Sequence, residues 1–193
     1  MSKHKVFLIV GRTASGKTSL AKEASKKLNL KLLKSYITRP MRNGEIADAD
    51  HTFIEPDKVD LYKDRMIAYT DKIDQYVRFA TIDQLLDSDL YIIDPSGIDY
   101  LRTCKFKELK DIELIEIYIR VPYTKAIHYA LKRGDSLDAF QQRYDSESKQ
   151  FSYYEHHQQF KYHILNDGDF NDTYNKLENI IKKELGYDTG TSE

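Results

Sequence analysis

The eight residues from Gly11 to Thr18 have the types and the spacing that bind a chain of phosphates. They read Gly-Arg-Thr-Ala-Ser-Gly-Lys-Thr and fit the pattern G-x-x-x-x-G-K-[ST] at every fixed position. The glycines let the backbone curl until its N–H groups point at phosphate oxygens. Lys17 would then reach the β- and γ-phosphates of a nucleoside triphosphate, and the Thr18 hydroxyl would ligate Mg²⁺. The residues predicted to contact the nucleotide here are Gly11, Thr13, Ala14, Ser15, Gly16, Lys17 and Thr18.

A second candidate phosphate site is the polar run at residues 35–45. Arg39 and Arg42 stand three residues apart in a turn that contains proline and glycine. Two guanidinium groups that close together suit a dianionic phosphate, and Glu45 would orient an arginine or contact the ligand. The alternative is a solvated basic loop with an incidental salt bridge. The phosphate loop at residues 11–18 favours the second phosphate site.

Asp94 is a candidate ligand-binding acid. It ends the apolar run 90–93 and precedes Pro95. An acid at the carboxyl end of a parallel strand points into the crevice where ligands bind. Asp94 would serve Mg²⁺ through a bound water, or the ribose and base of an acceptor. The alternative is an aspartate that forms a turn before proline.

Alternating strands and helices are expected to position these residues. The apolar run 6–10 is typical of a strand buried on both faces of a parallel sheet. Further strands are expected at 30–38, 52–54, 66–70, 76–80, 90–93, 114–121 and 162–165. Helices are expected at 19–28, 56–64, 81–86, 122–132 and 170–185, with a long helix that opens at Asp135 or Ser136. The pattern predicts an α/β fold with a mostly parallel sheet flanked by helices and a small β-rich insert.

The composition argues against several classes of function. The chain has 193 residues and a formal net charge of −1, without a basic stripe for nucleic acid or for a membrane surface. No apolar run reaches membrane-spanning length, and we expect no leader. Cys104 is the only cysteine, which suits a reducing cytosol. We therefore expect a cytoplasmic monomer or homodimer that binds small-molecule nucleotides, with no nucleic acid or membrane partner.

The run S-x-x-T-R-x-x-R-x-G-E at residues 35–45, with the phosphate loop and two later arginines, resembles the guanylate kinase family. The similarity extends from Val6 to about Leu185. It implies a P-loop NTPase fold and an enzyme that transfers the γ-phosphoryl group of ATP to GMP or dGMP with Mg²⁺. It also implies a single domain at 1–185 with these parts: a core of 1–38 and 81–185, an acceptor-binding insert at about 39–80, and a helical lid at about 130–150, followed by a flexible tail at 186–193.

The resemblance assigns roles to single residues on the acceptor side. Arg39 and Arg42 would hold the acceptor phosphate, Ser35 would touch guanine, and Glu45 would support the site. The predicted acceptor-binding residues are Ser35, Arg39, Arg42, Glu45, His51, Tyr76 and Asp94.

The resemblance also assigns residues to the donor side and to the lid. Arg133 and Arg143 match lid arginines that close on the transferring phosphoryl group, where positioned charge is worth orders of magnitude in rate. Asn166 falls in the loop that contacts adenine. The predicted catalytic residues are Lys17, Arg42, Arg133 and Arg143.

The acceptor-base site departs from the family pattern. His51 stands where the family has a tyrosine, and Tyr76 is the nearest match to a later tyrosine-glycine pair. Ala68 stands where the family has a glutamate that reads the N1 and N2 hydrogens of guanine, and buried unpaired donors are costly. Asp71 or Asp74 would fill that role in another alignment.

Two other interpretations stay open. A kinase of the same fold would phosphorylate another nucleotide or a small acceptor, or the chain would be a non-catalytic guanylate kinase-like interaction module. Such modules usually have a damaged phosphate loop. Here Lys17, Thr18, Arg39 and Arg42 are all present, which favours an enzyme.

Overall fold

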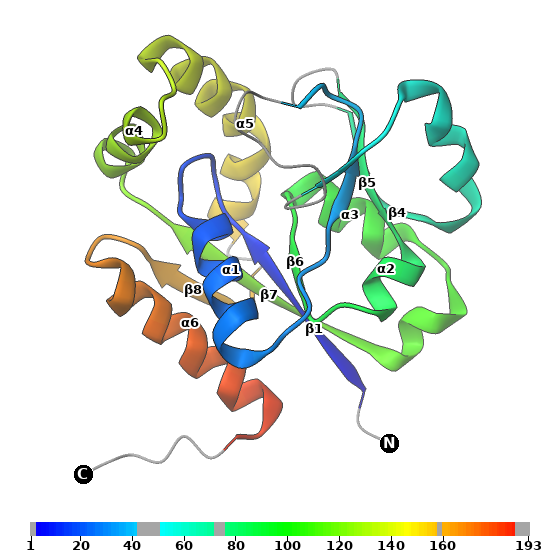
Figure 1. Cartoon of the computed structure of the whole chain (residues 1–193). Coiled ribbons are helices and arrows are strands. Elements are labelled where there is room, and N and C mark those ends of the chain that lie inside the picture. The colour runs from blue at the N-terminus through cyan, green and yellow to red at the C-terminus, as the bar shows by residue number, and fades with distance from the viewer. Residues whose placement is uncertain (1–2, 42–50, 72–75, 158–159, 188–193) are drawn as a thin grey trace.

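The structure is a computed structural model that describes residues 3–41, 51–71, 76–157 and 160–187. Its core is a sheet of four parallel strands in the order β6-β1-β7-β8 (Figure 1). These strands are β1 His4–Val10, β6 Leu90–Ile92, β7 Ile112–Arg120 and β8 Tyr162–Leu165. The predicted parallel sheet is confirmed, and β1 lies inside it with a hydrogen-bonded partner on each edge.

Helices flank this sheet, as expected for the α/β class. Among the described residues, the α-helices are α1 Lys17–Leu28, α2 Ile82–Leu86, α3 Pro95–Thr103, α4 Tyr123–Lys132, α5 Leu137–His157 and α6 Phe170–Leu185. The 3₁₀ helices are η1 Pro56–Arg65 and η2 Lys107–Asp111. None of the described helices combines the length and the apolar character that crossing a membrane would require.

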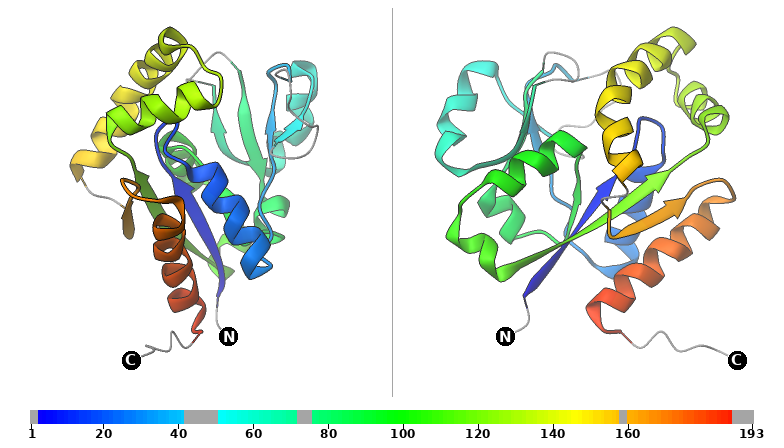
Figure 2. Two further views of the ribbon diagram at one scale, coloured as in Figure 1. Left: turned by 60° about the vertical axis from the view of Figure 1, so that its left-hand side comes forward. Right: turned by 180° about the vertical axis from the view of Figure 1, so that it is seen from behind.

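The apolar run of β1 is buried from both sides. Phe7 and Ile9 pack with α1 and α6, which lie in front of the sheet in Figure 1. Val6, Leu8 and Val10 pack on the other face with α3 and α5, which come forward in the reverse view of Figure 2. Alternate side chains of a strand point to opposite faces, so a sheet covered on both sides needs an unbroken apolar run.

A second sheet of four strands stands beside the core sheet, in the order β3-β2-β5-β4. Its strands are β2 Ser35–Ile37, β3 His51–Phe53, β4 Met66–Thr70 and β5 Arg78–Thr81. β2 is shorter than the predicted strand 30–38, because the chain first runs beside β6. There the Leu33 N–H donates to the Leu90 carbonyl at 2.8 Å before the chain crosses into the second sheet.

The helix α3 was not anticipated, and Asp94 explains why it forms. The Asp94 carboxylate accepts from the Gly97 N–H at 2.9 Å, and Pro95 occupies the first turn. An aspartate before proline is also typical of a turn, yet here it begins a helix, and Gly97 lies inside that helix. A Cβ at Gly97 would meet Cγ1 of Ile93 at 2.9 Å, so glycine is what lets α3 pack closely on the chain after β6.

The helices α4 and α5 include most of the segment 130–150 that is predicted to be a lid, and they have a small core of their own. Ala126 and Ala130 of α4 pack against Phe140 of α5, and this cluster reaches Ala14 of the phosphate loop. The Ser136 hydroxyl accepts from the Ala139 N–H at 3.1 Å, so Ser136 caps α5. The two helices therefore stand over the phosphate loop (Figure 1).

Candidate active site

A cavity of about 680 Å³ lies between the phosphate loop, the second sheet and the helices α4 and α5. It brings together most of the predicted site residues, although they come from distant parts of the chain. Those that line it are Gly11, Thr13, Ala14, Ser15, Gly16, Lys17, Thr18, Ser35, Arg39, His51, Asp94, Arg133, Arg143 and Asn166.

Three predicted acceptor-side residues are not placed on this lining. Tyr76 is 39% exposed and is absent from the described wall of the cavity. Arg42 and Glu45 lie outside the described residues, as does Asp74. Asp71 accepts from the Tyr69 hydroxyl at 3.3 Å and also lies off the lining, so its proposed reading of guanine gains no support.

The backbone of the phosphate loop has the shape that its glycines predict. Gly16 has a φ of 85° and precedes the first residue of α1. A Cβ at Gly11 would meet the Ile119 carbonyl oxygen at 2.7 Å, so only glycine fits there. The N-terminus of α1 has no side-chain cap, and the buried Ser15 hydroxyl has no hydrogen-bond partner among the described residues. Open N–H groups at a helix N-terminus and an unpaired hydroxyl suit a phosphate chain.

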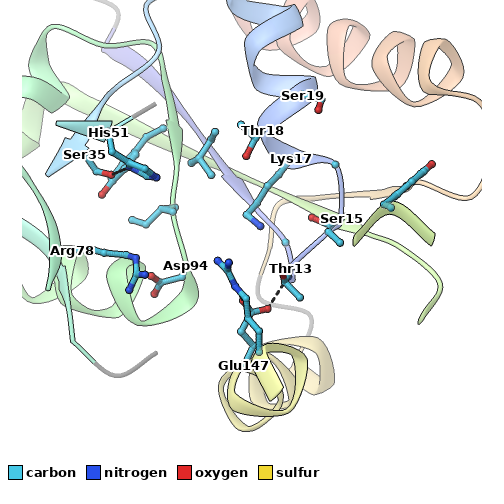
Figure 3. Close-up of a pocket in the computed structure, with 18 of the residues that line it drawn as sticks. Thr13, Ser15, Lys17, Thr18, Ser19, Ser35, His51, Arg78, Asp94 and Glu147 are labelled. Atoms are coloured by element: carbon cyan, nitrogen blue, oxygen red, sulfur yellow. Dashed lines mark hydrogen bonds and ion pairs between the residues drawn. The ribbon is translucent and has the colours of Figure 1, made fainter. Parts of the chain in front are cut away.

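Lys17 lies in the loop with its ammonium directed to the cavity (Figure 3). Its Nζ donates to the Arg12 carbonyl oxygen at 3.0 Å. Burial lowers the pKa of Lys17 to about 8, with Arg143 and Arg133 acting in the same direction and Glu147 opposing them. Lys17 is therefore a cation that an incoming phosphate would stabilise further.

Arg12 occupies a variable position of the motif, and its role was missed from the sequence. Its guanidinium makes two hydrogen bonds of 2.9 Å to the Glu155 carboxylate and one of 3.1 Å to the Ser148 hydroxyl. It also lies 4.9 Å above the centre of the Tyr144 ring. Burial acts against the charge, yet the hydrogen bond and charge of Glu155 raise the pKa of Arg12 above its usual value. Arg12 thus anchors the phosphate loop to α5.

Asn166 supports the phosphate loop from the other side. Its Nδ2 donates to the Ser15 carbonyl oxygen at 3.0 Å, and its Oδ1 accepts from the Thr173 hydroxyl at 3.1 Å. The side chain is 5% exposed, and both of its polar atoms are occupied. The structure therefore gives Asn166 a supporting role for the loop, while its contact with adenine stays a prediction.

The two predicted lid arginines reach the same cavity as Lys17. Arg133 follows α4 and forms an ion pair with Asp135. Arg143 lies on α5, where its Nε is 3.4 Å from Oε1 of Glu147. Arg133 and Arg143 therefore bring positive charge to the cavity that Lys17 faces, and both act to lower the pKa of Lys17.

The second sheet lines the part of the cavity where an acceptor is predicted to bind. The register of β2 and β3 sets Ser35 opposite His51, and the Ser35 hydroxyl lies 3.0 Å from Nδ1 of His51. Arg39 is 8% exposed, donates to the Pro40 carbonyl oxygen at 2.9 Å and lies 5.3 Å above the centre of the Phe53 ring. Arg39 is thus held in the wall of the cavity that the phosphate loop also lines.

Asp94 caps a helix rather than forming a turn, while its role in binding Mg²⁺ or the acceptor stays a prediction. Its Oδ1 accepts from the Gly97 N–H, from the Ser96 hydroxyl at 2.7 Å and from Nε2 of Gln150 at 3.1 Å. All three hydrogen bonds are accepted by Oδ1. Asp94 also lines the cavity. Arg78 of β5 also lines this cavity (Figure 3). Arg78 was not singled out from the sequence, because an arginine in a short strand has no motif to mark it.

The wall at Ala68 is unusual in its backbone. Ala68 has a φ of 53°, a left-handed conformation that is uncommon for alanine, and the pairing of β4 with β5 shifts register next to it. It is 3% exposed and lines the cavity. At this position the cavity offers a methyl group and no carboxylate.

Comparisons with known proteins agree with this architecture. The sequence model of the family described as guanylate kinase matches residues 3–184, and the chain therefore belongs to the guanylate kinase family. A crystal structure of guanylate kinase from Anaplasma phagocytophilum superposes with a TM-score of 0.64 at 17% sequence identity. That match covers 95% of this chain and 87% of the other, and at this identity it shows the fold. A comparison with curated protein sequences found no match.

Proposed function

We propose that this protein is an ATP-dependent nucleoside monophosphate kinase that transfers the γ-phosphoryl group of ATP to GMP or dGMP. The observation that carries the proposal is the single cavity that joins two kinds of anion site. One is the phosphate loop with Lys17, and the other is the predicted acceptor site, of which Arg39 lines the same cavity. Membership of the guanylate kinase family supports the same reaction class.

The phosphate loop would hold the β- and γ-phosphates of ATP with its N–H groups and Lys17. Thr18 lines the cavity and would ligate Mg²⁺ beside the phosphates, with Asp94 reached through a water. The residues present fit that ion, because Mg²⁺ keeps several waters and takes few protein ligands. Bound Mg²⁺ would neutralise charge on the transferring group.

The acceptor phosphate would lie on Arg39, with Arg42 as its proposed partner. It needs no dedicated nucleophile, because a phosphate monoester is already an oxyanion at neutral pH. Arg133 and Arg143 would stabilise the charge on the group in transfer, and closure of the helices that carry them would exclude water that hydrolyses ATP. Catalysis would consist of positioning and charge stabilisation.

The test is formation of ADP by the purified protein with Mg²⁺, ATP and each common nucleoside monophosphate in turn. We expect ADP formation that depends on GMP or dGMP. Lys17→Ala should lower turnover by about 100-fold or more with folding intact, and Arg39→Ala should raise KM for the acceptor more than KM for ATP. No turnover with any monophosphate would refute the kinase.

A second candidate keeps the reaction and changes the acceptor base. Ala68 offers no carboxylate to the hydrogens of guanine, and Arg78 adds a donor to the same half of the cavity. Arg78 would suit carbonyl or ring-nitrogen acceptors, which guanine also has, so the missing carboxylate at Ala68 is what favours another base. Turnover with another nucleotide in the same screen, and not with GMP or dGMP, would favour this candidate.

A further inference from the structure

Glu147 of α5 places a carboxylate inside the phosphate loop. It is 5% exposed and is the one buried aspartate or glutamate among the described residues. Its Oε2 accepts from the backbone N–H of Thr13 at 2.7 Å, the contact drawn as a dashed line in Figure 3. The proposed kinase has no use for this acid, since the acceptor phosphate needs no base to activate it.

The groups around the Glu147 carboxylate are of the kind that bind phosphate. One oxygen is bound by a loop N–H, and the other lies 3.4 Å from Nε of Arg143. The ammonium of Lys17 lies near enough for the charge of Glu147 to raise its pKa against the effect of burial. A backbone N–H, an arginine and a lysine are also the groups that bind phosphoryl oxygens.

We infer that the Glu147 carboxylate occupies part of the phosphate site of the loop in the free protein. It binds the Thr13 N–H there and leaves it when a triphosphate binds. A carboxylate and a phosphate cannot share this N–H and these cations, because like charges in contact repel strongly where water is excluded. The inference rests on the proposed triphosphate site and is independent of the acceptor.

The same helix has a contact that would persist after Glu147 moves. Ser148, the next residue of α5, binds Arg12 of the loop at 3.1 Å, and Glu155 binds the same guanidinium. α5 therefore stays attached to the loop while the Glu147 side chain turns away. The exchange also frees Arg143 from Glu147, so that triphosphate binding releases a lid arginine for the phosphoryl group.

The test compares the affinity of the intact protein for inorganic tripolyphosphate with that of Glu147→Gln and Glu147→Ala, by calorimetry. Tripolyphosphate needs the loop but neither base site. We expect both variants to bind it about tenfold more tightly, because the competing charge is gone. Asp145→Asn is the matched control: Asp145 is exposed on the same helix and accepts only from Gln141 at 2.9 Å among the described contacts, so its affinity should equal that of the wild type.

The amide proton of Thr13 gives a second measurement that does not depend on affinity. In the free wild type it should resonate downfield, as expected for a bond to a carboxylate, and Glu147→Ala should move it upfield. Saturating tripolyphosphate should bring the wild type and the variant to the same shift. The inference would be overturned if both Glu147 variants bound tripolyphosphate as tightly as the wild type or more weakly. It would also be overturned if the chemical shift of the Thr13 amide proton were the same in the variants and the wild type. A failed acceptor screen would refute the kinase and leave this result standing.

Discussion

At the scale of single residues, the site depends on charges that are held in place by backbone groups. Lys17 donates to the Arg12 carbonyl oxygen, Arg39 donates to the Pro40 carbonyl oxygen, and Asp94 accepts from the Gly97 N–H. Such contacts fix side chains before a ligand arrives, which lowers the entropy lost on binding. Each of these residues was visible in the sequence as a charge beside glycine or proline.

The lowered pKa of Lys17 leads to a prediction about protons. At pH 8 the free protein should carry about half of the Lys17 charge, because the pKa is about 8. A bound triphosphate raises that pKa, so binding at pH 8 should take up as much as about half a proton, and ATP affinity should fall as the pH rises above 8.

Calorimetric titration of ATP in buffers that differ in ionisation enthalpy measures this proton uptake. Lys17→Met is the control and should lose the part of the uptake due to Lys17. The same proton count for Lys17→Met and the wild type, or an ATP affinity that rises above pH 8, would contradict the assignment.

At the scale of elements, α5 connects the lid region to the phosphate loop. Its middle carries Arg143 and Glu147 toward the cavity, and its last turns hold Arg12 through Glu155. Movement of this helix during the proposed closure would therefore displace the loop residue Arg12 that it binds.

Removing the guanidinium that joins these two elements should destabilise the fold. Arg12→Ala leaves the Glu155 carboxylate without its main partner and removes the contact with the Tyr144 ring, at a cost of about 2 kcal/mol in the free energy of unfolding. Urea denaturation measures the change. Arg102→Ala breaks an ion pair with Glu116 on a more exposed arginine and should cost less than about 1 kcal/mol. Equal losses in the free energy of unfolding for the two substitutions would contradict the role of Arg12 as an anchor between the loop and α5.

The sequence predicted those elements whose signal is local. Apolar runs marked β1 and β7, and the glycines with Lys17 marked the loop before α1. The helix α3 was missed because an aspartate before proline is also typical of a turn, and Gly97 inside the helix allows close packing against Ile93. The contacts of Arg12 and Glu147 could not be predicted, since their partners lie 143 and 134 residues away in the chain.

At the scale of the whole molecule, the two sheets divide the work of the site. The parallel sheet and α1 present the phosphate loop, and the second sheet presents Ser35, Arg39 and His51 to the same cavity. We expect the two proposed anion sites to approach each other when both substrates are bound, which would exclude water from the reaction.

The most direct test of this account is the affinity for a bisubstrate analogue in which adenosine and guanosine are joined by five phosphates. If the phosphate loop and Arg39 share one cleft, the analogue fills both sites at once. Calorimetry should then show binding at least about 100-fold tighter than that of ATP alone, with most of the gain lost in Arg39→Ala. An affinity within about threefold of that for ATP would mean that the two sites do not act on one pair of substrates, and the account would be wrong.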